Sequence, residues 1–198
     1  MARTSTFLFW FLCLGVALVS WRFIPLGVEA AMGFVAYHAI ERPLAFFAHV
    51  GLAPVALALM PFQFSAQLRS RRPVLHRWIG RAYGLAILAA GTGGLVMALG
   101  TDAGVVAAVG FALLAVIWIG VTARGITLAM AGRIGEHRVW MIRSAALTFA
   151  AVTLRLWLPA LQSVMPFEQA YTLVAWLCWV PNLLVAEWAI LGRRVAVA

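Results

Sequence analysis

Residues 69–84 read RSRRPVLHRWIGRAYG and lie between two long apolar runs. Where the second run begins, the stretch places a histidine, a tryptophan and two arginines close together, namely His76, Arg77, Trp78 and Arg81. A membrane face holds such side chains at little cost, because their apolar parts are buried while their polar ends reach water. The stretch therefore predicts the start of a membrane-spanning helix.

A second stretch, GEHRVWMIRS at residues 135–144, has the same residue types at the start of another apolar run. Its histidine, arginines and tryptophan are His137, Arg138, Trp140 and Arg143. We expect the two basic stretches to lie at the same face of a membrane.

The composition indicates an integral membrane protein. Hydrophobic residues make up 65% of the 198 residues and charged residues 11%, whereas a soluble domain has about 25% charged residues. All 15 basic residues are arginine, and the formal net charge is +9. Because these arginines cluster in short loops beside apolar runs, we interpret them as an orientation signal that also attracts anionic lipid headgroups, not as a nucleic-acid-binding surface. Cys13 and Cys178 lie within apolar runs, so no disulfide framework is expected.

Six apolar runs are long enough to span a bilayer, which requires about 20 helical residues. We predict an all-α integral membrane bundle, forming one transmembrane domain over residues 1–198, with spans at about 6–23, 44–68, 78–99, 105–124, 140–161 and 170–191. Residues 24–43 predict a short interfacial helix or loop. The first run also resembles a signal peptide, with Val28-Glu29-Ala30 as a cleavage site, but its length favours a retained helix. Pro159 predicts a break near the end of the fifth span.

The distribution of arginines predicts which way the chain crosses the membrane. With six spans, twelve arginines fall on one side: Arg3, Arg69, Arg71, Arg72, Arg77, Arg81, Arg124, Arg133, Arg138, Arg143, Arg193 and Arg194. Only Arg22 and Arg42 fall on the other side, and Arg155 lies within a span. Cytoplasmic loops carry an excess of positive charge, so both termini are predicted to be cytoplasmic.

Ionisable side chains inside a span are expensive to bury and are therefore candidates for function. Counted by helical rise, His49 and Arg155 reach similar depths towards the outer face, where they could share a polar pocket. Alternatively, Arg155 extends to the membrane surface and His49 bonds to a backbone carbonyl. Glu187 is expected at the level of Arg81 and Arg143, and an ion pair with one of them is favoured over a catalytic role.

The two histidines of the basic stretches are candidate metal ligands. His76 and His137 stand at the starts of the third and fifth spans, just before the apolar runs. These spans run in the same direction, so the two imidazoles are expected at one depth. Two such histidines on neighbouring helices can ligate the iron of a b-type haem. Its propionates would then pair with nearby arginines, namely Arg77, Arg81, Arg138 and Arg143. The alternative is that both histidines only bond to loops or headgroups.

Four segments carry a family resemblance: Pro61-Phe62-Gln63, the LHRWIGRAY run at 75–83, the HRVWMIRS run at 137–144, and Thr153-Leu154-Arg155-Leu156. In these motifs the chain, from about His49 onward, resembles the bacterial membrane-protein family catalogued as domain of unknown function 2306, which implies no established reaction. More distantly, it is similar to the two-haem transmembrane cytochrome b proteins, whose ligands pair the second span with the fourth and the third with the fifth. The fourth span here has no histidine, so only the pair of His76 and His137 matches that pattern.

The sequence leaves three functions open and predicts no catalytic residue, since no span carries a nucleophile motif, a metal-protease signature or a phosphate loop. The first is a multi-pass protein of the bacterial inner membrane that binds haem b and carries electrons. The second is a lipid- or small-molecule-binding protein, or an accessory subunit of a membrane complex or homo-oligomer. The third is a small transporter, motivated by His49 and Arg155. Six short-looped spans without discontinuous half-helices weaken that third hypothesis.

Overall fold

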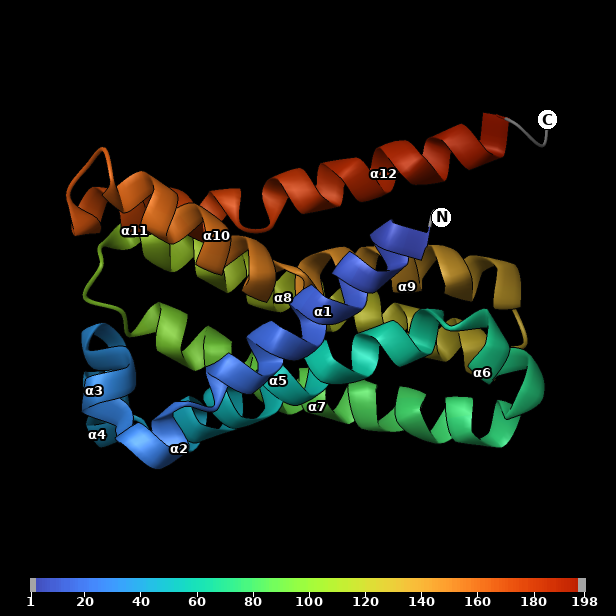
Figure 1. Ribbon diagram of the computed structural model, residues 1–198, viewed down its shortest axis with the longest axis horizontal. Helices are drawn as coiled ribbons and strands as arrows, with labels where there is room; N and C mark the ends of the chain where they lie inside the picture. The colour runs from blue at the N-terminus through green and yellow to red at the C-terminus, as the bar shows by residue number, and fades with distance from the viewer. Residues whose placement is uncertain (1–2, 196–198) are drawn as a thin grey trace. The chain divides into compact units, whose positions relative to one another are not determined.

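The computed structural model describes residues 3–195, which form helices and connecting turns with no β-strand (Figure 1). The chain divides into two compact units, Met1–Met97 and Ala98–Ala198. Each unit is described by itself.

The first unit contains three long helices and a group of short ones (Figure 1). In chain order they are α1 (Arg3–Ser20), α2 (Phe23–Leu26), α3 (Val28–Met32), the 3-10 turn η1 (Gly33–Val35), α4 (Tyr37–Glu41), α5 (Pro43–Phe64), α6 (Ala66–Arg71) and α7 (Pro73–Leu99), whose last two residues belong to the second unit. Pro43 and Pro73 each open a long helix, a position where the missing proline N–H costs nothing. The segment expected to be an interfacial helix or loop forms the short helices α2 to α4.

Helix α1 packs along α5. The Trp10 ring meets the Phe62 ring edge-on at 4.7 Å between centroids. The indole N–H of Trp21 donates to the Gly51 carbonyl oxygen at 3.0 Å. These contacts join the middle of α1, and the residue just after its end, to α5.

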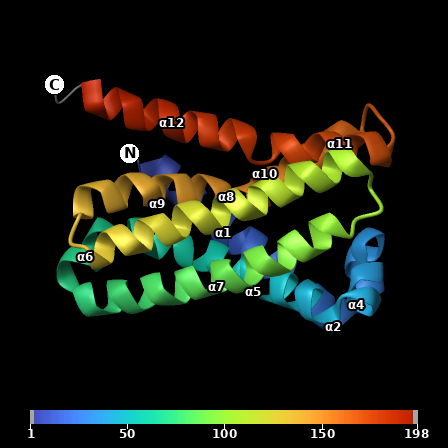
Figure 2. The ribbon, with the colours of Figure 1, turned by 180° about the vertical axis from the view of Figure 1, so that it is seen from behind.

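The second unit is built from α8 (Val105–Met130), α9 (Ile134–Thr148), α10 (Ala150–Gln162), α11 (Phe167–Leu177) and α12 (Val180–Val195), as Figure 2 shows from behind. Helix α8 packs against both α9 and α11, while α10 packs against α11 and α9 against α12. Gly104 and Gly132, with φ of 85° and 73°, lie in the turns that flank α8, where a side chain would be strained.

Six helical segments are long and apolar enough to cross a membrane, which confirms the predicted number of spans in the described part of the chain. They are Thr4–Leu26, Pro43–Phe64, Pro73–Leu99, Val105–Met130, Ile134–Gln162 and Phe167–Gly192. The third and fifth begin earlier than predicted, so His76 and His137 lie within the first turns of α7 and α9 instead of preceding them.

The predicted break at Pro159 is wrong. Pro159 lies inside α10, which continues to Gln162. The fifth span is interrupted at Phe149 instead, where the hydrogen-bond ladder tightens and the Val152 N–H donates to the Phe149 carbonyl at 2.9 Å. The sixth span is interrupted at Cys178 and Trp179, just before Pro181. Each of these two spans is thus divided by a turn of one or two residues, while as a whole it remains one helical segment long enough to cross a membrane.

Candidate functional site

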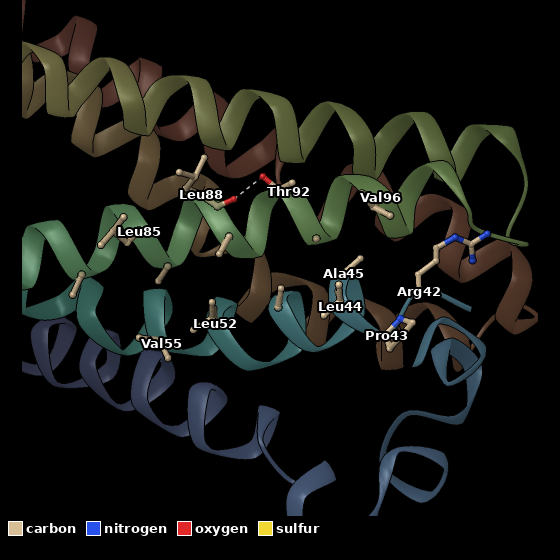
Figure 3. Close-up of a pocket in the computed structure, with 15 residues that line it drawn as sticks. Arg42, Pro43, Leu44, Ala45, Leu52, Val55, Leu85, Leu88, Thr92 and Val96 are labelled. Atoms are coloured by element: carbon tan, nitrogen blue, oxygen red, sulfur yellow. Dashed lines mark hydrogen bonds between the residues drawn. The ribbon is translucent and has the colours of Figure 1, made fainter. Parts of the chain in front are cut away.

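An apolar groove lies between α5 and α7 in the first unit (Figure 3). Its volume is about 1020 Å³. Aliphatic side chains from both helices supply most of the lining, among them Leu44, Leu52, Val55, Leu85, Leu88 and Val96. The Thr92 hydroxyl, also in the lining, donates to the Leu88 carbonyl at 2.8 Å. The groove therefore offers an almost wholly apolar surface along two membrane-spanning helices.

Arg42 supplies the charge in this lining and lies at one end of the groove (Figure 3). It immediately precedes Pro43, the first residue of α5. Its Nη1 donates to a carboxylate oxygen of Glu41, and it lies 3.3 Å from Nδ1 of the buried His38. The side chain of Glu41 is 52% exposed and that of Arg42 is 30% exposed. The groove thus ends at a partly exposed guanidinium group whose carboxylate partner is itself exposed.

His49, on α5, fixes the approach of α7. Its Nδ1 lies 2.9 Å from the Ala90 carbonyl oxygen, which can only accept, so Nδ1 carries the proton and Nε2 the lone pair. The imidazole rests on Gly94, where a Cβ would lie 2.8 Å from Nδ1. His49 therefore makes the backbone-carbonyl bond that the sequence offered as the alternative to a pocket.

Arg155, the other predicted member of that pocket, lies on α10 in the second unit. Its Nη1 donates to the Ala151 carbonyl, one turn earlier on the same helix, at 2.9 Å. His49 and Arg155 belong to different units, and each bonds to a main-chain oxygen within its own unit.

The predicted haem ligands are also divided between the units. In the first, the His76 carbonyl accepts a hydrogen bond from the Gln63 amide of α5 at 3.3 Å. In the second, Nδ1 of His137 lies 2.8 Å from the Gly125 carbonyl oxygen of α8. That bond fixes the tautomer and leaves the lone pair of His137 on Nε2, the arrangement in which a protein orients a metal-binding histidine.

The acidic residue Glu187 of α12 pairs with Arg143 of α9. Arg143 Nε and Nη2 donate to the two carboxylate oxygens at 2.5 and 2.9 Å. The guanidinium also lies over the Trp140 ring, 4.8 Å from its centroid. Arg81, the other arginine considered for Glu187, lies over Trp78 in the first unit at 4.7 Å. Both basic stretches thus stack an arginine on the tryptophan three residues earlier. Arg77 and Arg138 are exposed.

The sequence did not single out Arg42, Thr153 or Asn182 as site residues. Arg42 has a sequence signal, since it is one of two arginines on the arginine-poor side. Asn182 lies in the sixth span and donates to the Thr153 hydroxyl at 3.0 Å and the Cys178 carbonyl at 2.9 Å. An asparagine at membrane depth is itself a signal, because its amide needs partners there. Within residues 3–195, no group of three or more His, Cys, Asp or Glu side chains could hold a metal ion.

Comparison with known proteins identifies a family. A model described as "Predicted membrane protein (DUF2306)" matches residues 46–190. No curated protein and no solved structure matches the chain. The matched region covers most of α5 and the whole of α7 to α11, and so includes both basic stretches and most of the groove. This chain therefore belongs to the DUF2306 family of predicted membrane proteins.

Proposed function

We propose that the protein binds one lipid-like molecule with an acidic head group, in the groove between α5 and α7, within a bacterial inner membrane. The observation that carries the proposal is an apolar groove of about 1020 Å³ that ends at Arg42. Ligand sites typically measure about 300–1000 Å³ and combine an apolar lining with a few polar groups. The groove has this composition, and its length follows two spans.

The head group is assigned by charge. An acidic group at the Arg42 end would accept hydrogen bonds from the guanidinium, as carboxylates and phosphates do. The Glu41 carboxylate already accepts a hydrogen bond from the Arg42 guanidinium. Because the Glu41 side chain is 52% exposed, it can rotate away from Arg42 and remain solvated. When an acidic head group replaces the Glu41 carboxylate, the Arg42 guanidinium therefore remains paired with an anion.

The test is native mass spectrometry of the protein purified in a mild detergent with bacterial lipids. We expect one tightly retained acidic lipid or fatty acid per chain. Ala89→Phe places a ring in the groove lining and should reduce occupancy by roughly tenfold, which corresponds to about 1.4 kcal/mol. The matched control Val116→Phe, on the exposed face of α8, should retain the lipid.

Two further variants separate the head group from the tail. Arg42→Gln should lower the preference for acidic over zwitterionic lipid, whereas Arg77→Gln, an exposed arginine outside the groove, should not. Equal lipid retention by wild type and Ala89→Phe would contradict the proposal.

A second candidate function, haem binding at His76 and His137, is favoured by one observation. The Gly125 carbonyl orients His137 so that Nε2 holds the lone pair. A bound haem would supply one-electron redox chemistry, and arginines such as the exposed Arg77 and Arg138 would pair with its propionates. Arg143 is a weaker propionate partner, because it already holds Glu187.

An absorption spectrum tests this second candidate. Protein expressed with ample haem should give a Soret band that both His76→Ala and His137→Ala abolish. The control His49→Ala should leave that band in place. A wild-type protein without the band would eliminate the haem candidate and leave the lipid proposal unaffected.

A further inference from the structure

The two interrupted spans of the second unit meet at a polar cluster. The interruption at Phe149 separates α9 from α10, and that at Cys178 and Trp179 separates α11 from α12. Thr153 follows the first interruption by one helical turn, and Asn182 follows Cys178 by four residues. Their side chains are hydrogen-bonded to each other and to main-chain oxygens at both places.

The cluster lies near the middle of both spans. Thr153 is 162 − 153 = 9 residues from the end of α10, and Cys178 is 178 − 167 = 11 residues from the start of α11. At ~1.5 Å per residue these counts give about 14 and 16 Å. The hydrocarbon core is ~30 Å thick, so the cluster is expected at its midplane.

The interruption in the sixth span releases carbonyl oxygens from the helical ladder. Pro181 has no N–H to donate to the Leu177 carbonyl, so the helix cannot continue regularly through this point. The Cys178 carbonyl, one residue further along, accepts from two side chains, the Thr153 hydroxyl at 2.5 Å and the Asn182 amide at 2.9 Å. An unwound carbonyl at this depth is thus directed at side chains of both spans.

In this cluster, the acceptor oxygen atoms outnumber the hydrogen atoms that the Asn182 amide and the Thr153 hydroxyl can donate. The Asn182 amide nitrogen lies within 3.2 Å of three oxygens, those of the Ala146 carbonyl, the Cys178 carbonyl and the Thr153 hydroxyl. It has two hydrogens for these three acceptors. The Thr153 hydroxyl, with one hydrogen, also has the Phe149 and Ala150 carbonyls within 3.3 Å. The partly positive amide therefore occupies the centre of an oxygen-rich cage.

We propose that this cage is a binding site for a monovalent cation of the sodium class, formed by the Thr153 hydroxyl and the Cys178 and Ala146 carbonyls. Asn182 completes the set when its amide turns by 180° and presents Oδ1 in place of Nδ2. All four ligands are neutral oxygens, which suit a monovalent ion, whereas divalent ions take carboxylates. Unwound carbonyls at interrupted spans coordinate sodium in secondary transporters, so the site is physically suited to ion-coupled movement of a substrate.

Thermal unfolding in detergent tests the proposal, with choline chloride replacing NaCl at constant ionic strength. In wild type we expect the unfolding midpoint to rise by a few degrees and saturate with Na⁺, because an ion that binds only the folded state stabilises it. Thr153→Val removes one ligand and should abolish this rise. Thr153→Ser keeps the hydroxyl and should preserve it.

Thr172→Val is the matched control, since that hydroxyl donates to the Glu168 carbonyl on its own helix at 2.8 Å. It should respond to Na⁺ like wild type. Asn182→Asp adds a charged oxygen to the cage and should tighten the apparent Na⁺ affinity at least tenfold, which keeps the test decisive if Thr153→Val fails to fold. A wild-type midpoint that is equal in Na⁺ and choline, an undiminished rise in Thr153→Val, or an unchanged affinity in Asn182→Asp would each overturn the proposal.

Discussion

Gly93 sets how closely α7 approaches α5. A Cβ at this position would overlap the Ala45 carbonyl oxygen and lie 3.1 Å from the His49 backbone nitrogen. Both are main-chain atoms, so the neighbour cannot yield by changing a rotamer. We expect Gly93→Ala to lower the free energy of unfolding by about 1–3 kcal/mol, as overpacking does, and to distort the groove. Thermal unfolding of the purified protein measures the effect.

Gly51 provides the control on α5, because a Cβ there meets nothing within 4 Å. Gly51→Ala should be neutral or stabilise the protein by up to about 1 kcal/mol, since alanine is the better helix former. Equal destabilisation by the two substitutions would show that Gly93 acts through the backbone alone and not through the helix contact.

At the scale of single residues, sequence reasoning identified side chains more readily than their partners. Because burying a charge is costly, the sequence predicts that Glu187 pairs with Arg81 or Arg143. In the structure Glu187 pairs with Arg143. Counting residues predicts the depth of His49, but its contact with Ala90 depends on Gly94, which leaves room for the imidazole, and on Gly93, which lets the two backbones approach. Arg42 was counted only as an outer-face charge, because nothing in the sequence places the groove beside it.

At the scale of helices, the ion pair of Arg143 and Glu187 joins α9 to α12. It has two charge-assisted hydrogen bonds, and the arginine side chain is only 19% exposed. Glu187→Ala would leave the guanidinium without this partner, and we expect a loss of about 1–3 kcal/mol in the free energy of unfolding. Arg143→Lys keeps the charge but not the two-pronged geometry, so its loss should be intermediate.

The pair of Arg133 and Glu136 is the control, because it lies within one helix region, with side chains 53% and 51% exposed. Glu136→Ala should cost less than about 0.5 kcal/mol. The exchanged double variant, Arg143→Glu with Glu187→Arg, should recover part of the stability lost by either single change. A double variant that is no better than the singles would indicate that the residues act through packing, not through their charges.

The interruptions within spans five and six could be predicted only in part. Pro181 accounts for the break at Cys178 and Trp179, although its position in the sequence alone does not distinguish a break from a tolerated proline within a span. The break predicted at Pro159 does not occur. Helix α10 continues for only three residues beyond Pro159, so few backbone hydrogen bonds follow the proline. Phe149 carries no glycine or proline signal, so the sequence gives no indication of the turn there.

For the molecule as a whole, the sequence predicts the number of spans correctly, because that number depends only on how many apolar runs are long enough to cross a bilayer. The division into two compact units had no such signal, because both units consist of the same kind of apolar helix. The orientation of the chain in the membrane depends on how many arginines lie on each side, and helix packing does not determine it. It is therefore the property that an experiment on the intact membrane should measure.

Cysteine labelling in intact cells with a membrane-impermeant maleimide makes that measurement. Cys13 and Cys178 have no exposed surface, so they give little background. Asp102→Cys and Ser163→Cys, at exposed positions between spans, should react in intact cells if both termini are cytoplasmic. Gln67→Cys, exposed on α6, should react only after the membrane is permeabilised. The opposite pattern would mean that the arginine-rich loops face outward, and labelling of all three in intact cells would mean that α5 and α7 do not cross the membrane as a pair.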